Sequence, residues 1–95
     1  MFEWDEAKRR TNLLKHRLDF RDAVALFDGR PRLDGSATDR GERRQFTVAI
    51  LDDLFVTLIW TWRSETRRAI SMRRARNGER EAYRRLLLRG TEGDG

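Results

Sequence analysis

The pattern of apolar and polar positions near the N-terminus predicts a short strand followed by a helix. The strand covers residues 2–4, and Asp5 follows where an N-cap would accept hydrogen bonds from the first helical turn. The helix covers residues 5–16. Its first turn carries Glu6, and an acidic side chain at that position suits the helix dipole.

A second helix is predicted by a clearer periodicity. Apolar residues recur at i, i+3, i+4 and i+7 and so form one stripe: Phe20, Ala23, Val24 and Phe27. Asp19 is placed to cap this helix, and Gly29 and Pro31 follow it as terminating residues. We therefore expect a short amphipathic helix whose stripe packs against the rest of the protein.

The middle of the chain shows the alternation of an antiparallel sheet. It predicts strands over residues 45–51, 54–63 and 67–73. Residues 34–43 are polar and lack periodicity, which predicts a loop after a short edge strand at 32–34. The first two long strands are separated only by two aspartates, which indicates a tight connection.

The C-terminal part returns to a helical pattern. Asn77 can cap a helix over residues 78–89, and residues 90–95 are expected to form a disordered tail. The order of elements predicts an α+β fold in one domain, residues 1–89. In this fold two N-terminal helices pack on a three- to four-stranded antiparallel sheet, and one helix follows at the C-terminus.

Composition and charge narrow the class of protein. The chain has 95 residues, no cysteine and a formal net charge of +5. Thiolate zinc sites and cysteine nucleophiles are therefore excluded, and without a membrane-spanning or leader pattern we expect a cytoplasmic protein. Residues 63–89 hold ten arginines against three glutamates, a clustering that favours RNA or DNA as a partner.

Alternation assigns the strand residues to faces. If Ile70 and Met72 pack against the helices, the opposite face carries hydroxyls and guanidiniums: Thr57, Thr61, Arg63, Arg67, Ser71 and Arg73. This surface suits a phosphodiester backbone. An ordinary solvated sheet face shows the same pattern, so alternation alone leaves both interpretations open.

Other groups can take part in chemistry or stabilise the fold. His16, beside Lys15, can shuttle protons or complement the helix dipole. The last helix carries a set that can supply acid–base chemistry and phosphate contacts, or fill the core: Glu79, Arg80 and Tyr83. Trp60 is expected in the core, whereas Trp62, at a strand end, can pack or stack on a base. No metal-ligand or nucleotide-binding motif occurs, so we expect no metal and no cofactor.

Motifs along most of the chain resemble the BrnT toxins. The N-terminal half carries Phe2-x-Trp4-Asp5-x-x-Lys8, Asn12-x-x-Lys15-His16 and Phe20-x-x-Ala23 with Phe27. The second half carries Thr61-Trp62-Arg63, Ile70-Ser71-x-Arg73-x-Ala75 and Glu79-Arg80-x-x-Tyr83. The matches run in order from Phe2 to Tyr83, and so many together are highly specific.

The resemblance implies a bacterial ribonuclease toxin of a type II toxin–antitoxin system, with a RelE-like fold and metal-independent RNA cleavage that inhibits translation. It also implies a ribbon-helix-helix antitoxin similar to BrnA, operator DNA bound only through that complex, and a candidate homodimer within it. The implied catalytic residues are Lys15, His16, Arg63, Arg73, Glu79 and Tyr83. The expected RNA contacts are Thr61, Arg67, Ser71 and Arg80.

Two of the positions that depart from the family's pattern lie beside candidate site residues. Arg17 stands where the family has a glycine that ends the helix in the left-handed conformation, so we expect His16 to change direction. Gly78 is expected to loosen the geometry of Glu79 and Tyr83.

The expected chemistry is attack of the RNA 2′-hydroxyl on the adjacent phosphorus. Arg63 and Arg73 would stabilise the charge, and Glu79 or His16 would take the proton. Two other functions stay open at this point. A non-catalytic RNA- or DNA-binding module predicts salt-sensitive binding without cleavage. A structural subunit that receives an acidic protein predicts a melting temperature that depends on its partner.

Overall fold

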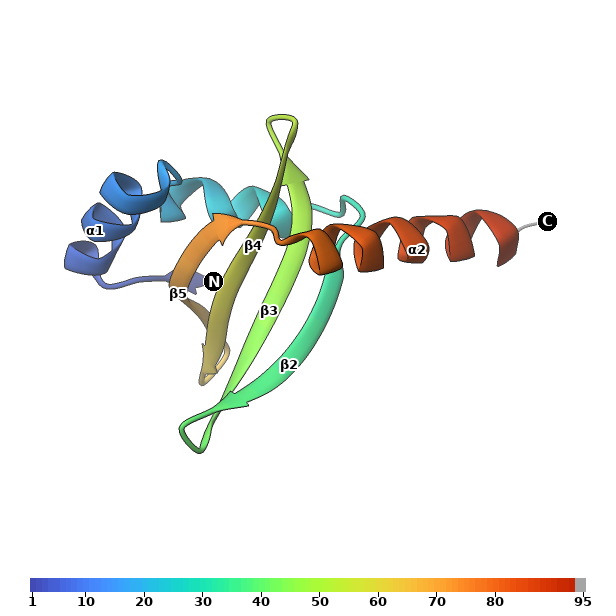
Figure 1. Ribbon diagram of the computed structural model, residues 1–95. Coiled ribbons are helices and arrows are strands. Elements are labelled where there is room, and N and C mark those ends of the chain that lie inside the picture. The colour runs from blue at the N-terminus through green and yellow to red at the C-terminus, as the bar shows by residue number, and fades with distance from the viewer. Residues whose placement is uncertain (94–95) are drawn as a thin grey trace.

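Five strands form one sheet in the order β1-β5-β4-β3-β2, with helical segments on both sides of it (Figure 1). The computed structural model describes the backbone of residues 1–93 and the side chains of residues 1–89. Its elements are β1 (Phe2–Glu3), α1 (Glu6–His16), η1 (Phe20–Phe27), β2 (Leu33–Asp39), β3 (Glu42–Leu51), β4 (Leu54–Arg63), β5 (Thr66–Arg74) and α2 (Asn77–Gly93). The predicted α+β class is confirmed, but the sheet is larger than predicted, and β1 pairs with β5 in parallel.

Strand β2 corrects the predicted loop over residues 34–43. It pairs along its whole length with β3 across a two-residue turn, in which Arg40 and Gly41 have φ of 52° and 79°. Two successive positive φ angles match the twist of a β-hairpin. The strand was missed because an edge strand needs few apolar residues, and most of β2 is exposed.

The segment η1 begins and ends where the second helix was predicted, but it is a 3₁₀ helix rather than an α-helix. A period of three residues buries every third side chain, and Phe20, Ala23 and Leu26 are fully buried. Val24, expected on the packed stripe, is 50% exposed. The predicted stripe is confirmed for Phe20, Ala23 and Phe27, which pack in or against the core. It was wrong for Val24, because it assumed the α-helical period.

The sheet has two unlike faces. The helix face, covered by α1 and η1, holds the hydrophobic core, which consists of Leu18, Phe20, Ala23, Leu26, Ala49, Leu51, Val56, Leu58, Trp60, Ala69 and Met72. The open face, on the other side, is covered at one end by α2, where Tyr83 packs edge-on against Phe55 at 5.7 Å between ring centroids. In Figure 1, α2 crosses in front of the sheet at that end and then runs away from it.

A β-bulge in β5 changes the faces that alternation predicted. Ile59 pairs with Ser71, but Trp60 pairs with Ala69, so Ile70 is the extra residue. Every β5 side chain before the bulge therefore changes face. Ser71 and Arg73 lie on the open face as predicted, whereas the placement of Arg67 there was wrong: its guanidinium lies over the Phe27 and Trp60 rings on the helix face.

Helix α1 is joined to the edge of β5 by one buried side chain. The Asn12 amide donates to the Met72 carbonyl at 2.9 Å and accepts from the Met72 N–H at 3.0 Å, as a neighbouring strand would. It also donates to the Leu18 carbonyl at 3.0 Å. Asn12 thereby satisfies three buried backbone groups and fixes the position of α1 beside β5.

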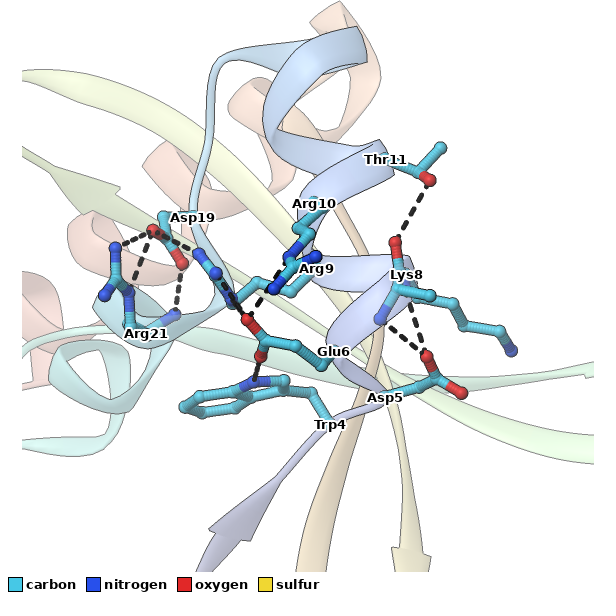
Figure 2. Close-up of polar contacts among 10 residues, drawn as sticks. Trp4, Asp5, Glu6, Lys8, Arg9, Arg10, Thr11, Asp19 and Arg21 are labelled. Atoms are coloured by element: carbon cyan, nitrogen blue, oxygen red, sulfur yellow. Dashed lines mark hydrogen bonds and ion pairs between the residues drawn. The ribbon is translucent and has the colours of Figure 1, made fainter.

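Polar contacts secure the other side of α1 (Figure 2). Asp5 caps the helix by accepting from Ala7 N–H at 2.9 Å, as predicted. Glu6 accepts from Arg9 Nε at 2.9 Å, and this bond together with one from Trp4 lowers the pKa of Glu6 to about 2. Arg9 also reaches Asp19, the cap of η1, at 3.1 Å.

Arg17 ends α1 without the glycine of the family's pattern. Its φ is 60°, in the left-handed region, and its N–H bonds to the Leu13 carbonyl at 2.9 Å. Arg17 thus ends the helix in the left-handed conformation that a glycine takes more readily. The expected change in the direction of His16 stays a prediction.

Helix α2 extends beyond its predicted end at residue 89. Its backbone is helical to Gly93, and residues 94–95 of the predicted tail lie outside the described residues. Leu86 and Leu88 on this helix are 39% and 60% exposed. Within residues 1–93, no helix is both long and apolar enough to cross a bilayer.

Candidate active site

The centre of the open face is a charged pair formed by Arg73 on β5 and Glu79 on α2. Arg73 Nη1 and Nη2 donate to the two Glu79 carboxylate oxygens at 2.8 and 3.0 Å. Both side chains are about one-fifth exposed, at 21% and 22%. This two-bond geometry fixes the plane of the guanidinium and leaves part of it accessible to a ligand on the open face.

Two further donors surround Glu79. The Thr57 hydroxyl donates to it at 3.0 Å, and the backbone N–H of Arg76 donates at 2.7 Å. The second bond is half of a capping box, because it comes from the residue before the first turn of α2. This corrects the prediction that Asn77 caps the helix, and Gly78 leaves the contacts of Glu79 in place.

Those contacts change the chemistry available to Glu79. The hydrogen bonds from Arg73, Arg76 and Thr57 lower its pKa to about 2, although burial opposes the shift. The hydrogen bonds that Arg73 donates to Glu79 in turn raise the pKa of Arg73. At neutral pH Glu79 is an ionised carboxylate whose oxygens already accept bonds from Arg73, Thr57 and Arg76, which makes it a poor proton acceptor.

A cleft of about 300 Å³ lies between α1 and β5 and reaches Ser71, two residues before Arg73 on the same strand. Its walls are formed by residues from one side of α1 and from the bulge of β5: Ala7, Lys8, Thr11, Asn12, Lys15, His16, Ile70 and Ser71. Ser71 and Arg73 are two residues apart on one face, about 7 Å along the strand. The structure thus brings Lys15, His16 and Ser71 to the same part of the molecule as Arg73.

A second hollow, of about 290 Å³, continues the open face on the other side of Arg73. It is lined by residues of all four long strands and the residue that caps α2: Ala37, Asp39, Arg44, Gln45, Phe46, Ile59, Arg73 and Arg76. Gly35 makes this surface possible, because a Cβ there would lie 2.3 Å from the Phe46 ring that crosses it. Arg73 therefore stands between two hollows that four other cations line: Lys8, Lys15, Arg44 and Arg76.

Arg63 and Thr61 lie at the other end of the open face. Arg63 pairs with Thr66 whereas Arg73 pairs with Thr57, which separates the two arginines by about 20 Å along the strands. Arg63 is 66% exposed and lies 3.6 Å from Glu3, which also pairs with Arg68. Thr61 donates to the Arg43 carbonyl at 3.5 Å. Arg73, Glu79 and the residues that line the two hollows beside Arg73 are called the Arg73 cluster below. The structure does not bring Arg63 and Thr61 to this cluster.

Three other predicted residues lie away from the cluster. Tyr83 is 3% exposed, and its hydroxyl donates to the Pro31 carbonyl at 3.4 Å, so it fills the space between α2 and the sheet. Arg80 donates to Asn77 and lines a separate hollow with Asp53 and Arg74. Arg67 lies on the helix face.

Sequence reasoning missed Lys8, Thr11, Arg44 and Arg76 as neighbours of the cluster. Lys8 precedes Lys15 by seven residues, two helical turns, so the α-helical period carried the signal. In Figure 2 its side chain points away from the Glu6–Arg9–Asp19 contacts. Among the side chains of residues 1–89, no three histidines or carboxylates gather as a metal ion requires.

Comparison with known families gives one match. Residues 4–79 match the model of a family described as BrnT, the ribonuclease toxin of type II toxin–antitoxin systems. The match runs from Trp4 to Glu79, so it includes α1, every strand of the sheet except β1, and the Arg73–Glu79 pair. No curated protein matches the sequence.

Proposed function

Given that this chain belongs to the BrnT family of ribonuclease toxins from type II toxin–antitoxin systems, we propose that it cleaves RNA without a metal ion on the open face of its sheet. The observation that carries this proposal is the Arg73 guanidinium, held by two bonds to Glu79 between two hollows lined by cations. A fixed cation of this kind stabilises charge that develops on a phosphate without having to reorganise.

The cleavage is an internal transfer at phosphorus. The RNA 2′-oxygen forms a bond to the adjacent phosphorus, and the bond from phosphorus to the 5′-oxygen breaks. Arg73 stabilises the charge on the five-coordinate phosphorane. His16 takes the proton of the 2′-hydroxyl, and the Lys15 ammonium gives a proton to the leaving 5′-oxygen. The products are a 2′,3′-cyclic phosphate and a 5′-hydroxyl.

The remaining predicted residues take supporting roles in this proposal. Glu79 and Thr57 position Arg73, and Tyr83 holds the first turns of α2 on the sheet. Ser71 offers a hydroxyl to the phosphate between Arg73 and the α1 cleft. Arg63 and Thr61 contact the RNA backbone away from the reacting phosphate, because they lie at the far end of the face. Arg80 stays a predicted RNA contact.

A protein antitoxin is the partner that the family implies. We propose that it is a ribbon-helix-helix protein similar to BrnA, and that it neutralises the toxin by covering the open face. In this proposal the complex, rather than the toxin, binds operator DNA, and the free toxin inhibits translation in the cytoplasm. The excess of arginine in residues 63–89 suits an acidic segment of such a partner.

The test is cleavage of ribosome-free RNA in excess chelator, with wild type, Arg73→Ala and Arg74→Ala side by side. Arg74 is the matched control because it is exposed and belongs to the opposite face of the same strand. We expect Arg73→Ala to lower the rate by roughly 10²–10³-fold and Arg74→Ala to leave it within a few-fold. The end groups of the fragments should be a cyclic phosphate and a 5′-hydroxyl.

Three results would contradict the proposal. Fragments with 3′-hydroxyl and 5′-phosphate ends would show a different reaction. Equal cleavage by both variants would show that the active site lies elsewhere. Salt-sensitive RNA binding without cleavage, with folded protein, would favour the non-catalytic binding module.

A further inference from the structure

Arg67 has an unusual environment on the helix face, beside the last residue of η1. Its guanidinium carbon lies 4.1 Å from the centroid of Phe27, 5.0 Å from that of Trp60 and 4.8 Å from that of Trp62. Three rings therefore surround one cation, and this arrangement fixes its position.

The same cation lacks an anionic partner. Among the residues whose side chains the structure describes, Arg67 has no ion pair, and its buried Nε has no hydrogen-bond partner. Burial lowers the pKa of Arg67, and Arg32 nearby acts in the same direction while Asp34 opposes it. A cation that has lost part of its hydration without gaining a counter-ion would be stabilised by a bound anion.

An accessible aromatic ring lies directly beside this cation. Trp62 is 50% exposed, whereas its neighbour Trp60, which it contacts edge-on at 5.0 Å, is only 5% exposed. Trp60 is also held by a bond from its Nε1 to Thr47 at 2.9 Å. Trp62 thus presents an open surface on a rigid support, next to an unpaired guanidinium.

The surface around Arg67 and Trp62 is also apolar and carries a second arginine. On the other side of Arg67 there is a hollow of about 180 Å³, lined by Met1, Phe2, Val24, Phe27 and Arg67. Arg32 lies 4.9 Å from the Phe27 ring, and its charge is already paired with Asp34 at 2.9 Å. Of these two arginines, only Arg67 lacks an ion pair among the described side chains. Apolar side chains lie on both sides of its guanidinium: the Trp62 ring on one side and the lining of the hollow on the other.

From these observations we propose that Trp62 and Arg67 form a second RNA-binding site, in which an unpaired base stacks on Trp62 and the adjoining phosphate pairs with Arg67. The proposal rests on the proposed ribonuclease function for its choice of ligand. A stacked base and a backbone phosphate are what an exposed aromatic ring beside a cation recognises in a single strand, without preference for sequence.

This site is separate from the proposed active site. Trp62 belongs to the opposite face of the sheet from Arg73, and it lies about 17 Å along β4 from Thr57, the partner of Arg73. An RNA that reaches both must pass around the end or the β1 edge of the sheet. The second site therefore holds single-stranded RNA at a distance from the bond that is cut.

The experiment measures binding without cleavage. The probe is a fluorescein-labelled oligoadenylate with 2′-O-methyl groups, which cannot undergo internal transfer, and fluorescence anisotropy gives its Kd. We expect Trp62→Ala to weaken binding about ten-fold or more. Arg67→Gln should weaken it and reduce the slope of log Kd against log salt by about 0.7, the value for one phosphate contact on a single strand. The exposed Arg85, on α2, provides the charge-matched control Arg85→Gln, which should change Kd less than two-fold.

A second variant separates stacking from folding. Trp62→Phe keeps a ring at this position, so it should bind within a few-fold of wild type but lose the quenching of tryptophan fluorescence that RNA causes. Melting curves show whether each variant is folded. Wild-type affinity in both Trp62→Ala and Arg67→Gln would overturn the proposal. So would unchanged RNA binding combined with lost antitoxin binding, which would make the site a protein interface. Binding that depends on Trp62 in a protein that never cleaves unmodified RNA would keep this site and reject the ribonuclease function instead.

Discussion

The two faces of the sheet differ in what holds them together. On the helix face, eleven buried apolar residues pack into one core, and such packing depends little on pH or salt. On the open face, the central contacts are a paired Arg73 and Glu79 with a hydroxyl and a backbone N–H around them. Charge-assisted bonds of this kind are strong and depend on protonation. We therefore expect the two faces to differ in how their contributions to the free energy of unfolding depend on pH.

The largest effect on stability is expected on the helix face. Phe20 is fully buried where η1 meets the sheet, and Phe20→Ala should lower the free energy of unfolding by about 3–5 kcal/mol. Val24→Ala, in the same helix but at a half-exposed position, should cost less than about 1 kcal/mol. Urea unfolding measures both. Equal losses would mean that η1 does not bury every third residue.

Asn12 connects the two faces, so its removal should affect both. Asn12→Ala leaves the Met72 N–H and carbonyl and the Leu18 carbonyl without their partner, which should cost about 2–4 kcal/mol. Because Asn12 also lines the α1 cleft, RNA cleavage should fall several-fold at temperatures where the variant is folded. Leu14→Ala, at a position of the same helix that is 81% exposed and outside the cleft, is the control for the helix itself. Full activity in folded Asn12→Ala would argue against the cleft as part of the site.

A smaller effect, and one that depends on pH, is expected at Glu79. Its pKa falls from the usual 4.5 to about 2 on folding, so its contribution to stability is present above pH 4.5 and is lost as the pH falls toward 2. The difference in unfolding free energy between wild type and Glu79→Gln should therefore shrink between pH 6 and about pH 3. Glu81→Gln, exposed on the same helix, should show no such trend. A difference that is constant with pH would mean that Arg73 does not pair with Glu79 in solution.

The smallest expected change is a gain in stability. Arg17 ends α1 at a φ of 60°, which a residue with a Cβ adopts at a cost of about 1 kcal/mol. Arg17→Gly should raise the unfolding free energy by roughly that amount, while Arg17→Ala, which removes the charge but keeps the Cβ, should not. A thermal melt of the three proteins decides between relief of strain and loss of charge.

The sequence predicted those elements whose signal is local. Asp5 and Asp19 cap helical segments where expected, and the alternation of residues 54–63 marked β4 correctly. It did not predict β2, because the pairing of an edge strand is supplied by its neighbour and its polar residues face solvent. The 3₁₀ period of η1 was also hidden, since Phe20 and Ala23 fit both helical periods and only Val24 and Leu26 distinguish them.

The strand residues of the candidate site were predictable from the sequence only where side chains along β5 alternate between the two faces without interruption. Ser71 and Arg73 follow the bulge and lie where alternation placed them, whereas Arg67 precedes it and lies on the other face. A single inserted residue has no signature in a strand of arginines, so this error could not be avoided from the sequence. The role of Glu79 likewise depends on Thr57, a contact between segments 22 positions apart.

The bond from the Arg76 N–H to Glu79 has a consequence for how the site can be observed. The carboxylate that closes the first turn of α2 is also the one that aligns Arg73, so fraying of that turn and disorder of the guanidinium are a single local opening event. The exchange of one backbone amide with deuterated solvent would then report how often the site is assembled. A ligand that bends or straightens α2 would change how often the first turn of the helix opens. The exchange rate of the Arg76 amide would show that change.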